Sequence, residues 1–94
     1  MKYVYPAIFG AEERGVYILF SDLPGCLPCA DDFNQAFKNA REGLTLHLYS
    51  MLKDGDELPP PSRLEDIPLE PNEALALIEV DLEGFKPDWS LHDE

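Results

Sequence analysis

One long stretch of this chain repeats its apolar residues with helical spacing, and this stretch constrains the fold more than any other feature. The apolar side chains recur at intervals of three or four positions, at Phe33, Phe37, Ala40, Leu44, Leu48 and Met51. That spacing is typical of an amphipathic helix with one buried stripe. A single stripe must bury itself against another layer, so we expect the other apolar segments to form a sheet.

The residues around this stripe predict where the helix begins and ends. Asp31 or Asp32 is expected to cap its N-terminus, and Asp32 followed by Gln35 has the spacing of a capping box. Gly55 is a plausible C-terminal cap. Gly43 lies inside the helix, where glycine costs about 1 kcal/mol relative to alanine, so it predicts close packing at that point.

Three apolar segments that precede the helix are short and predict strands. Residues 3–9 are aromatic and β-branched, and Pro6 places this strand near a sheet edge or at a bulge. A glycine-bounded turn at residues 10–15 joins it to a second strand at 16–20, which predicts a hairpin. Residues 26–30 are expected to form a short third strand.

Beyond the helix, a proline-rich connection precedes one more apolar segment. Residues 56–73 contain five prolines, three of them consecutive, which favours an extended path that runs back along the domain. Residues 74–82 fit a short helix or a strand, and the alternation of Ile78 and Val80 with acidic residues favours the strand. The predicted order is β-β-β-α-β, a two-layer α+β sandwich.

Both faces of the hairpin strands are apolar, whereas one helix covers only one face. The second face would then be a sizeable exposed apolar patch unless a partner subunit covers it. We therefore expect a homodimer or a higher homo-oligomer.

The chain has 94 residues, which is one domain's worth. We expect a folded domain over residues 1–85 and an acidic tail over 86–94, in which Trp89 either anchors a partner or folds back on the domain. No signal peptide and no membrane-length apolar stretch is present, so the expected location is cytoplasmic.

Charge limits the partners that this chain can bind. Nineteen acidic and seven basic residues give a net charge of −12, of which −10 lies in residues 51–94. Nucleic-acid backbones are bound by clustered Lys and Arg, and no basic patch is present here. Direct nucleic-acid binding is therefore disfavoured, and the acidity either steers a basic protein partner or only confers solubility.

Five acidic residues are candidates for contacting a basic partner. They lie in the expected turns and at the expected helix start, where the backbone is exposed, namely Glu12, Glu13, Asp22, Asp31 and Asp32. The same positions are also explained by turn formation and helix capping alone. The two interpretations are compatible, because a capping Asp still projects a negative potential.

Cys26 and Cys29 form a Cys-x-x-Cys motif, which raises the question of redox or metal chemistry. A redox pair needs a thiol at a helix N-terminus, and a metal site needs two further ligands. The expected helix begins two or three residues too late, and the chain contains only two histidines, His47 on the helix and His92 in the tail. We therefore interpret both cysteines as buried small apolar residues and expect no metal and no cofactor.

Several segments together resemble the HicB antitoxin family. They are Tyr5-Pro6-Ala7-Ile8-Phe9, Val16-Tyr17-Ile18-Leu19-Phe20, Asp22-Leu23-Pro24-Gly25-Cys26, Ala36-Phe37-Lys38-Asn39-Ala40-Arg41-Glu42-Gly43-Leu44, Asp54-Gly55 with Leu58-Pro59-x-Pro61-Ser62, and Leu77-Ile78-Glu79-Val80-Asp81. The resemblance spans about residues 3–82. It implies a truncated ribonuclease-H-like fold without catalysis and a small, basic, mRNA-cleaving toxin of the HicA type as partner. Many members carry a C-terminal DNA-binding domain, for which this sequence leaves no room.

The sequence supports three alternative hypotheses about the function. The leading hypothesis is a non-catalytic antitoxin-like module that occludes the RNA-binding face of a basic toxin. The alternative is an RNA-binding or regulatory protein that acts as an oligomer. An enzyme is the third, but a ribonuclease-H-type nuclease needs an acid on its first strand, and residues 3–9 contain none, which leaves only Glu42 and Asp81 as candidates.

Overall fold

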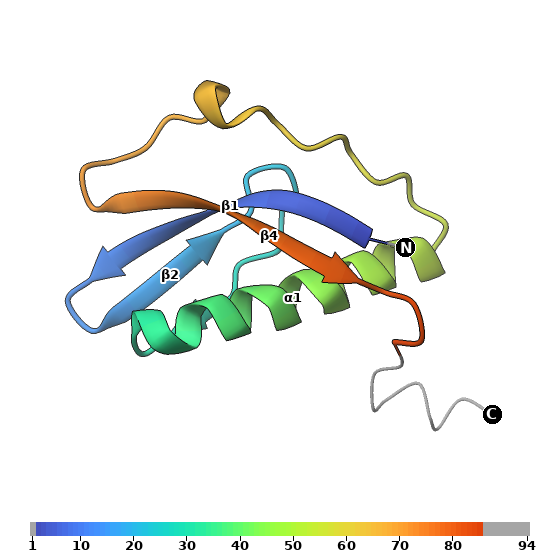
Figure 1. The fold of residues 1–94 in the computed structure, drawn as a ribbon, viewed down its shortest axis with the longest axis horizontal. Coiled ribbons are helices and arrows are strands. Elements are labelled where there is room, and N and C mark those ends of the chain that lie inside the picture. Colours follow the sequence, from blue (N-terminus) through green and yellow to red (C-terminus); the bar gives the residue numbers. More distant parts are fainter. Residues whose placement is uncertain (1, 86–94) are drawn as a thin grey trace.

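A computed structural model describes residues 2–85 of the chain (Figure 1). Four strands form one antiparallel sheet in the order β3-β2-β1-β4, and a single long helix packs across one face. The elements in chain order are β1 (Lys2–Glu12), β2 (Gly15–Leu19), β3 (Cys29–Ala30), α1 (Phe33–Lys53), a 3-10 turn η1 (Leu64–Asp66) and β4 (Glu73–Asp81). The predicted β-β-β-α-β sandwich is therefore confirmed.

The ends of α1 follow the local sequence signals. Asp32 is the N-terminal cap, and its Oδ1 accepts a hydrogen bond of 2.9 Å from the backbone N–H of Gln35. At the other end Asp54 is the C-cap, and Gly55 follows it with a φ of 80°, in the left-handed region that glycine tolerates best.

The buried stripe of α1 differs from the predicted stripe at its N-terminal end. Ala36, Ala40, Leu44 and Leu48 are fully buried, whereas the predicted core residues Phe33 and Phe37 are 46% and 49% exposed. The centroid of the Phe37 ring lies 4.7 Å from that of the Phe9 ring, and the rest of the Phe37 side chain is exposed to solvent. The first turns of α1 therefore contribute apolar surface as well as core.

Gly43 allows the close packing that its position predicted. A Cβ atom at residue 43 would lie 3.1 Å from Cγ of Pro28, closer than side chains ordinarily approach. The loop before β3 therefore lies directly against the middle of α1.

β1 is a central strand, although Pro6 predicted a position near an edge or at a bulge. The register of β1 with β4 runs from Lys2↔Asp81 to Gly10↔Glu73, but its register with β2 begins only at Ile8↔Leu19. At Pro6 the strand is therefore paired on one side, and the missing N–H leaves no gap in a ladder.

The predicted third strand is the least regular element. Only Cys29 and Ala30 pair with β2, rather than the whole of residues 26–30. The residues before them belong to a loop in which Leu23 and Cys26 enter the core. The segment at 74–82, for which a helix was the other interpretation, is a strand and pairs along its length with β1.

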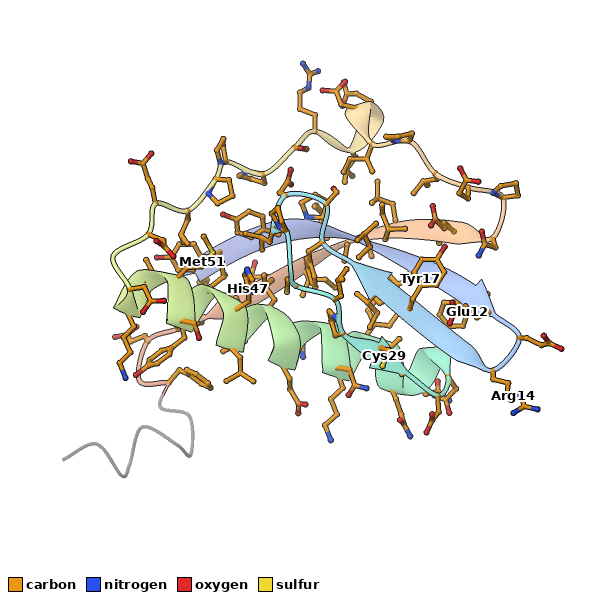
Figure 2. The ribbon with its side chains drawn as sticks, turned by 180° about the vertical axis from the view of Figure 1, so that it is seen from behind. Glu12, Arg14, Tyr17, Cys29, His47 and Met51 are labelled. Atoms are coloured by element: carbon orange, nitrogen blue, oxygen red, sulfur yellow. The ribbon has the colours of Figure 1, made fainter. Side chains whose placement is uncertain are left out.

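The outer face of the sheet, opposite α1, is covered in part by the chain's own connection. Residues 56–72 run along that side of the sheet, as both views show (Figures 1 and 2). Pro6 and Ile8 alternate with the helix-facing residues of β1 and are still buried. The second face is therefore covered at its centre by the proline-rich segment of the same chain, rather than by the partner subunit that the sequence analysis named as its cover. Val4 and Leu77 remain exposed there, by 36% and 56%.

Candidate protein-docking surface

Four of the five predicted contact residues lie at one end of the domain. Glu12 ends β1 and Glu13 lies in the turn that follows, whereas Asp31 and Asp32 join β3 to α1. The β2–β3 register pairs Val16 with Ala30 and so places Asp31 next to Gly15. The two segments are in close contact there, because a Cβ atom added at Gly15 would lie 2.7 Å from the carbonyl oxygen of Ala30. We call Glu12, Glu13, Asp31 and Asp32 the acidic end of the domain.

The acidic end is open to solvent and carries excess negative charge. All four carboxylates belong to exposed residues. Arg14 lies in the same turn as Glu13, and Figure 2 shows it at this end of the molecule beside Glu12. Four acidic groups against one guanidinium give this end a net charge that attracts a cationic surface.

Asp22 is separated from the acidic end and has a different set of contacts. It lies half-buried in the loop after β2, and its two carboxylate oxygens accept hydrogen bonds from the N–H and the hydroxyl of Ser62. The N–H bond measures 2.8 Å. Asp22 therefore fastens the connection to the β2–β3 loop, a role that the sequence did not indicate.

A polar cluster that the sequence analysis missed fixes the far end of the connection. The hydroxyl of Tyr17 donates a hydrogen bond to Glu73, and the side chain of Asn72 donates to Tyr17 Oη at 3.3 Å and to the carbonyl oxygen of Ala11 at 3.0 Å. The Tyr17 ring lies where a side chain at Gly10 would be, because an added Cβ would come within 1.9 Å of it. A glycine opposite an aromatic residue in the paired strand is the sequence signal for such packing.

Hydrogen bonding shifts the pKa values within this cluster. The backbone N–H of Glu70 and the Tyr17 hydroxyl both donate to the Glu73 carboxylate and lower its pKa. The same bond to Glu73 raises the pKa of Tyr17. Glu73 therefore stays charged, and its negative charge adds to this side of the molecule.

The two cysteines have different environments and no disulfide joins them. Cys26 is buried, and burial raises its thiol pKa to about 11, so the nucleophilic thiolate is scarce at neutral pH. Cys29 is exposed, which contradicts the expectation that both thiols are buried. The reason is that β3 is an edge strand and Cys29 pairs with Tyr17, whose side chain faces the outer side of the sheet.

An open groove borders Cys26, but its chemistry is sparse. Its volume is about 390 Å³, and its polar side chains are those of Cys26, His47 and Ser50. Within residues 2–85, no three His, Cys, Asp or Glu residues come together in a way that would hold a metal ion. The two acids considered for nuclease chemistry lie apart, since Asp81 faces the outer side of the sheet and Glu42 lies on α1, across the sheet.

Some of the residues named in the sequence analysis lie outside the part of the chain that the structure describes. Trp89, His92 and the expected acidic tail belong to residues 86–94, which the structure does not describe. Within the described part of the chain, no helix is both long and apolar enough to cross a membrane.

Residues 5–89 match a family model described as HicB_like antitoxin of bacterial toxin-antitoxin system. This match covers most of the chain, so the protein belongs to the HicB-like antitoxin family. The resemblance seen in the sequence is thereby confirmed.

A curated relative and two solved structures are similar to this chain. The relative is an uncharacterized 14.9 kDa protein from the rep-hol intergenic region of Haemophilus phage HP1 (strain HP1c1), 29% identical over 82 residues. The alignment covers 84% of this chain and 62% of the relative, so this chain spans less than two thirds of that protein.

The solved structures both come from toxin-antitoxin complexes. A chain of the HicA3 and HicB3 toxin-antitoxin complex is 26% identical, with a TM-score of 0.69, over 84% of this chain and 99% of that one. A chain of a toxin-antitoxin complex from Streptococcus pneumoniae has a TM-score of 0.82 over 94% of this chain and 75% of that one. Its identity is 17%, so this second likeness concerns the fold alone. The ribonuclease-H-like label stays a prediction.

Proposed function

We propose that this protein is a non-catalytic antitoxin module that neutralises a small, basic, mRNA-cleaving toxin of the HicA type. The observation that carries the proposal is the match of residues 5–89 to the HicB-like antitoxin model. The similar chain of the HicA3 and HicB3 complex supports a toxin as the partner.

The proposed mechanism is occlusion of the toxin's RNA-binding face. Such a face must be basic to hold a phosphate backbone, so it suits a protein with a net charge of −12. The acidic end would speed the encounter by steering, and packing at the interface would then exclude RNA. This mechanism needs no bond to be made or broken by the antitoxin, and we place the protein in the cytoplasm, where an mRNA-cleaving toxin meets its substrate.

We also propose a homo-oligomer, although the apolar area available for self-association is smaller than the sequence suggested. The connection covers the centre of the outer face, so among residues 2–85 the exposed parts of Val4 and Leu77 and of the connection leucines Leu64 and Leu69 remain for self-association there. Light scattering at micromolar concentration distinguishes a dimer from a monomer.

The proposal predicts that a HicA-type protein is encoded beside this one, and it is tested with an inactive variant of that protein, which permits expression. We expect it to bind this protein in surface plasmon resonance, and we expect the unmodified toxin to lose mRNA cleavage when the two are mixed. No binding, or undiminished cleavage in the complex, would overturn the proposal. Tight RNA binding by this protein alone at physiological salt would instead favour the RNA-binding alternative.

The role of the acidic end is tested by reversing charge there. Glu13→Lys with Asp31→Lys leaves the Asp32 cap in place, and Asp56→Lys with Glu57→Lys is the control with the same change in net charge beyond the other end of α1. We expect the first pair to slow association about tenfold at low salt, with a smaller effect on dissociation, and the control to slow it less. Equal effects of the two pairs would show that only total charge matters.

A further inference from the structure

The outer edge of β4 is an open sheet edge nine residues long. β4 is the last strand in the order β3-β2-β1-β4, and among residues 2–85 no other strand pairs with its far side. Figure 1 shows β4 in front of β1, with the connection passing above both strands, on the side away from α1. A free strand edge is a template for pairing with another chain.

The hydrogen bonds at the start of the β1–β4 ladder identify which backbone groups face outward. Ala11 N–H donates to the carbonyl oxygen of Asn72 at 3.0 Å, which makes these two residues a hydrogen-bonded pair. Because bonded pairs alternate along an antiparallel ladder, Ala74, Ala76 and Ile78 bond to β1. The N–H and C=O groups of Leu75, Leu77 and Glu79 therefore point away from the sheet. The N–H of Glu73, which is in the same phase, bonds instead to Glu70 at 2.9 Å.

The edge is protected at its ends but not in its middle. Glu79 places a charge at one end, and at the other end the N–H of Glu73 is already bonded to Glu70, whereas Ala74–Ile78 contains no charge and no proline and pairs with β1 in continuous register without a bulge. Charges, prolines and bulges are the usual means by which an edge strand resists pairing. The middle of β4 is therefore open to an added strand.

Charge disfavours a second copy at this edge in the register that pairs the uncharged stretch with itself. A second copy that paired the uncharged stretch with itself about Ala76 would put Glu73 opposite Glu79 at both ends. Like charges directly opposite one another destabilise a strand pair. A strand with Lys or Arg at those two positions would gain from the same geometry.

The helix-facing side of this edge also offers apolar surface to an added strand. Ala74 lies opposite Phe9 in the sheet and is exposed, and Phe9 is the residue on which the half-exposed Phe37 packs. A strand added beyond β4 would continue this face of the sheet next to Ala74 and Ala76, whose small side chains leave room for a larger one.

We infer that the basic protein partner adds one of its strands to the β4 edge, bonding to the backbone of Leu75, Leu77 and Glu79, with cationic side chains near Glu73 and Glu79. This inference rests on the proposed function, because the partner's basic character comes from there. According to this inference, backbone hydrogen bonds along β4 hold the partner in the complex, whereas the acidic end increases the rate at which the two proteins meet.

The test is backbone amide hydrogen exchange, read residue by residue by NMR on the full-length chain, free and with the inactivated HicA-type protein. In the free chain the amides of Leu75, Leu77 and Glu79 should exchange quickly, and those of Ala76 and Ile78 slowly. In the complex the three outward amides should slow by at least about tenfold.

A pair of variants at Leu77 isolates the main-chain contribution. Leu77→Pro removes the outward N–H without removing a bond to β1, and Leu77→Ala removes the side chain but keeps the N–H. We expect Leu77→Pro to bind the toxin roughly tenfold more weakly than Leu77→Ala. If Leu77→Pro does not fold, the exchange measurement on the unmodified chain still decides.

Each outcome supports or overturns the inference. Binding with Leu75, Leu77 and Glu79 still exchanging quickly would overturn the strand pairing and leave the proposed function standing. Slow exchange of these amides in the free chain, with a dimer mass, would show that a second copy occupies the edge and would overturn it too. Absence of binding would overturn the proposed function and this inference together.

Discussion

At the scale of single residues, the helix cap separates two neighbouring aspartates that the sequence left as alternatives. Asp32 accepts a hydrogen bond from Gln35 N–H, and Asp31 makes no comparable bond to the first turn of α1 among the described contacts. Asp32→Ala should lower the free energy of unfolding by about 1 kcal/mol, because it leaves an N-terminal N–H of the helix without its acceptor. Urea denaturation followed by circular dichroism measures this. Asp31→Ala is the control and should change stability by less than half as much; equal losses would contradict the assignment of the cap.

The two thiols should also differ in reactivity. At pH 8 a thiol reagent should label Cys29 within minutes and Cys26 only after unfolding, because burial raises the Cys26 pKa to about 11. Mass spectrometry of the labelled chain would give one adduct under native conditions and two in guanidinium chloride. Two adducts in the native protein would contradict the buried position of Cys26, and the Cys29→Ser variant should give none.

At the scale of elements, the connection over residues 56–72 is the part whose placement depends most on a few polar contacts. Asp22 holds it at Ser62, Tyr5 donates a hydrogen bond to the carbonyl oxygen of Pro59, and Asn72 ties its end to β1. Most of its side chains are exposed, so these bonds, rather than a large apolar area, determine its position.

Loss of the Asp22 carboxylate should therefore loosen the connection before it unfolds the domain. Asp22→Ala should speed proteolytic cleavage within residues 56–72 by roughly tenfold, because both of its acceptor oxygens are lost. Limited proteolysis with mass spectrometry measures this. The exposed residue Asp56 provides the control, since Asp56→Ala removes the same charge without removing a contact to the β2–β3 loop. Unchanged cleavage in Asp22→Ala would show that the apolar contacts of the connection suffice.

At the scale of the whole molecule, self-repulsion of a net charge of −12 opposes compactness. Raising NaCl from about 0.02 M to about 0.5 M shortens the Debye length from roughly 20 Å to roughly 4 Å. We expect the thermal midpoint, measured by circular dichroism, to rise over this range. KCl should act in the same way, because screening does not depend on which monovalent cation is used. A falling midpoint would show that favourable ion pairs outweigh the repulsion.

Local signals in the sequence account for most of the secondary structure. The helix, a cap at Asp31 or Asp32, the Gly55 terminus and the close packing at Gly43 were all predictable, because each depends on residues within a few positions or on a missing side chain. The prediction of Phe33 and Phe37 as core residues was wrong for a different reason. Periodicity identifies the face of a helix that turns toward the sheet, but not how far the sheet extends beneath each turn.

The candidate surface was predictable only in part. The acidic residues of the turn and of the helix start stand out in the sequence, but their gathering at one end depends on the β2–β3 register. Asp22 is also an acidic residue in a turn, but it lies away from the acidic end and bonds to Ser62. The sequence does not reveal this contact, because Ser62 is 40 residues away in the chain. The cluster of Tyr17, Asn72 and Glu73 likewise joins residues more than 50 positions apart.

The sequence by itself determined the position of the helix, the net charge and the family resemblance, since these follow from local spacing, composition and short motifs. Only the tertiary structure decided that the proline-rich connection covers the outer face and that β4 is left with an open edge. Both depend on strand order and on contacts between distant segments. A homogeneous apolar pattern on both faces of β1 shows that each face is to be covered, but not whether another subunit or the same chain provides the cover.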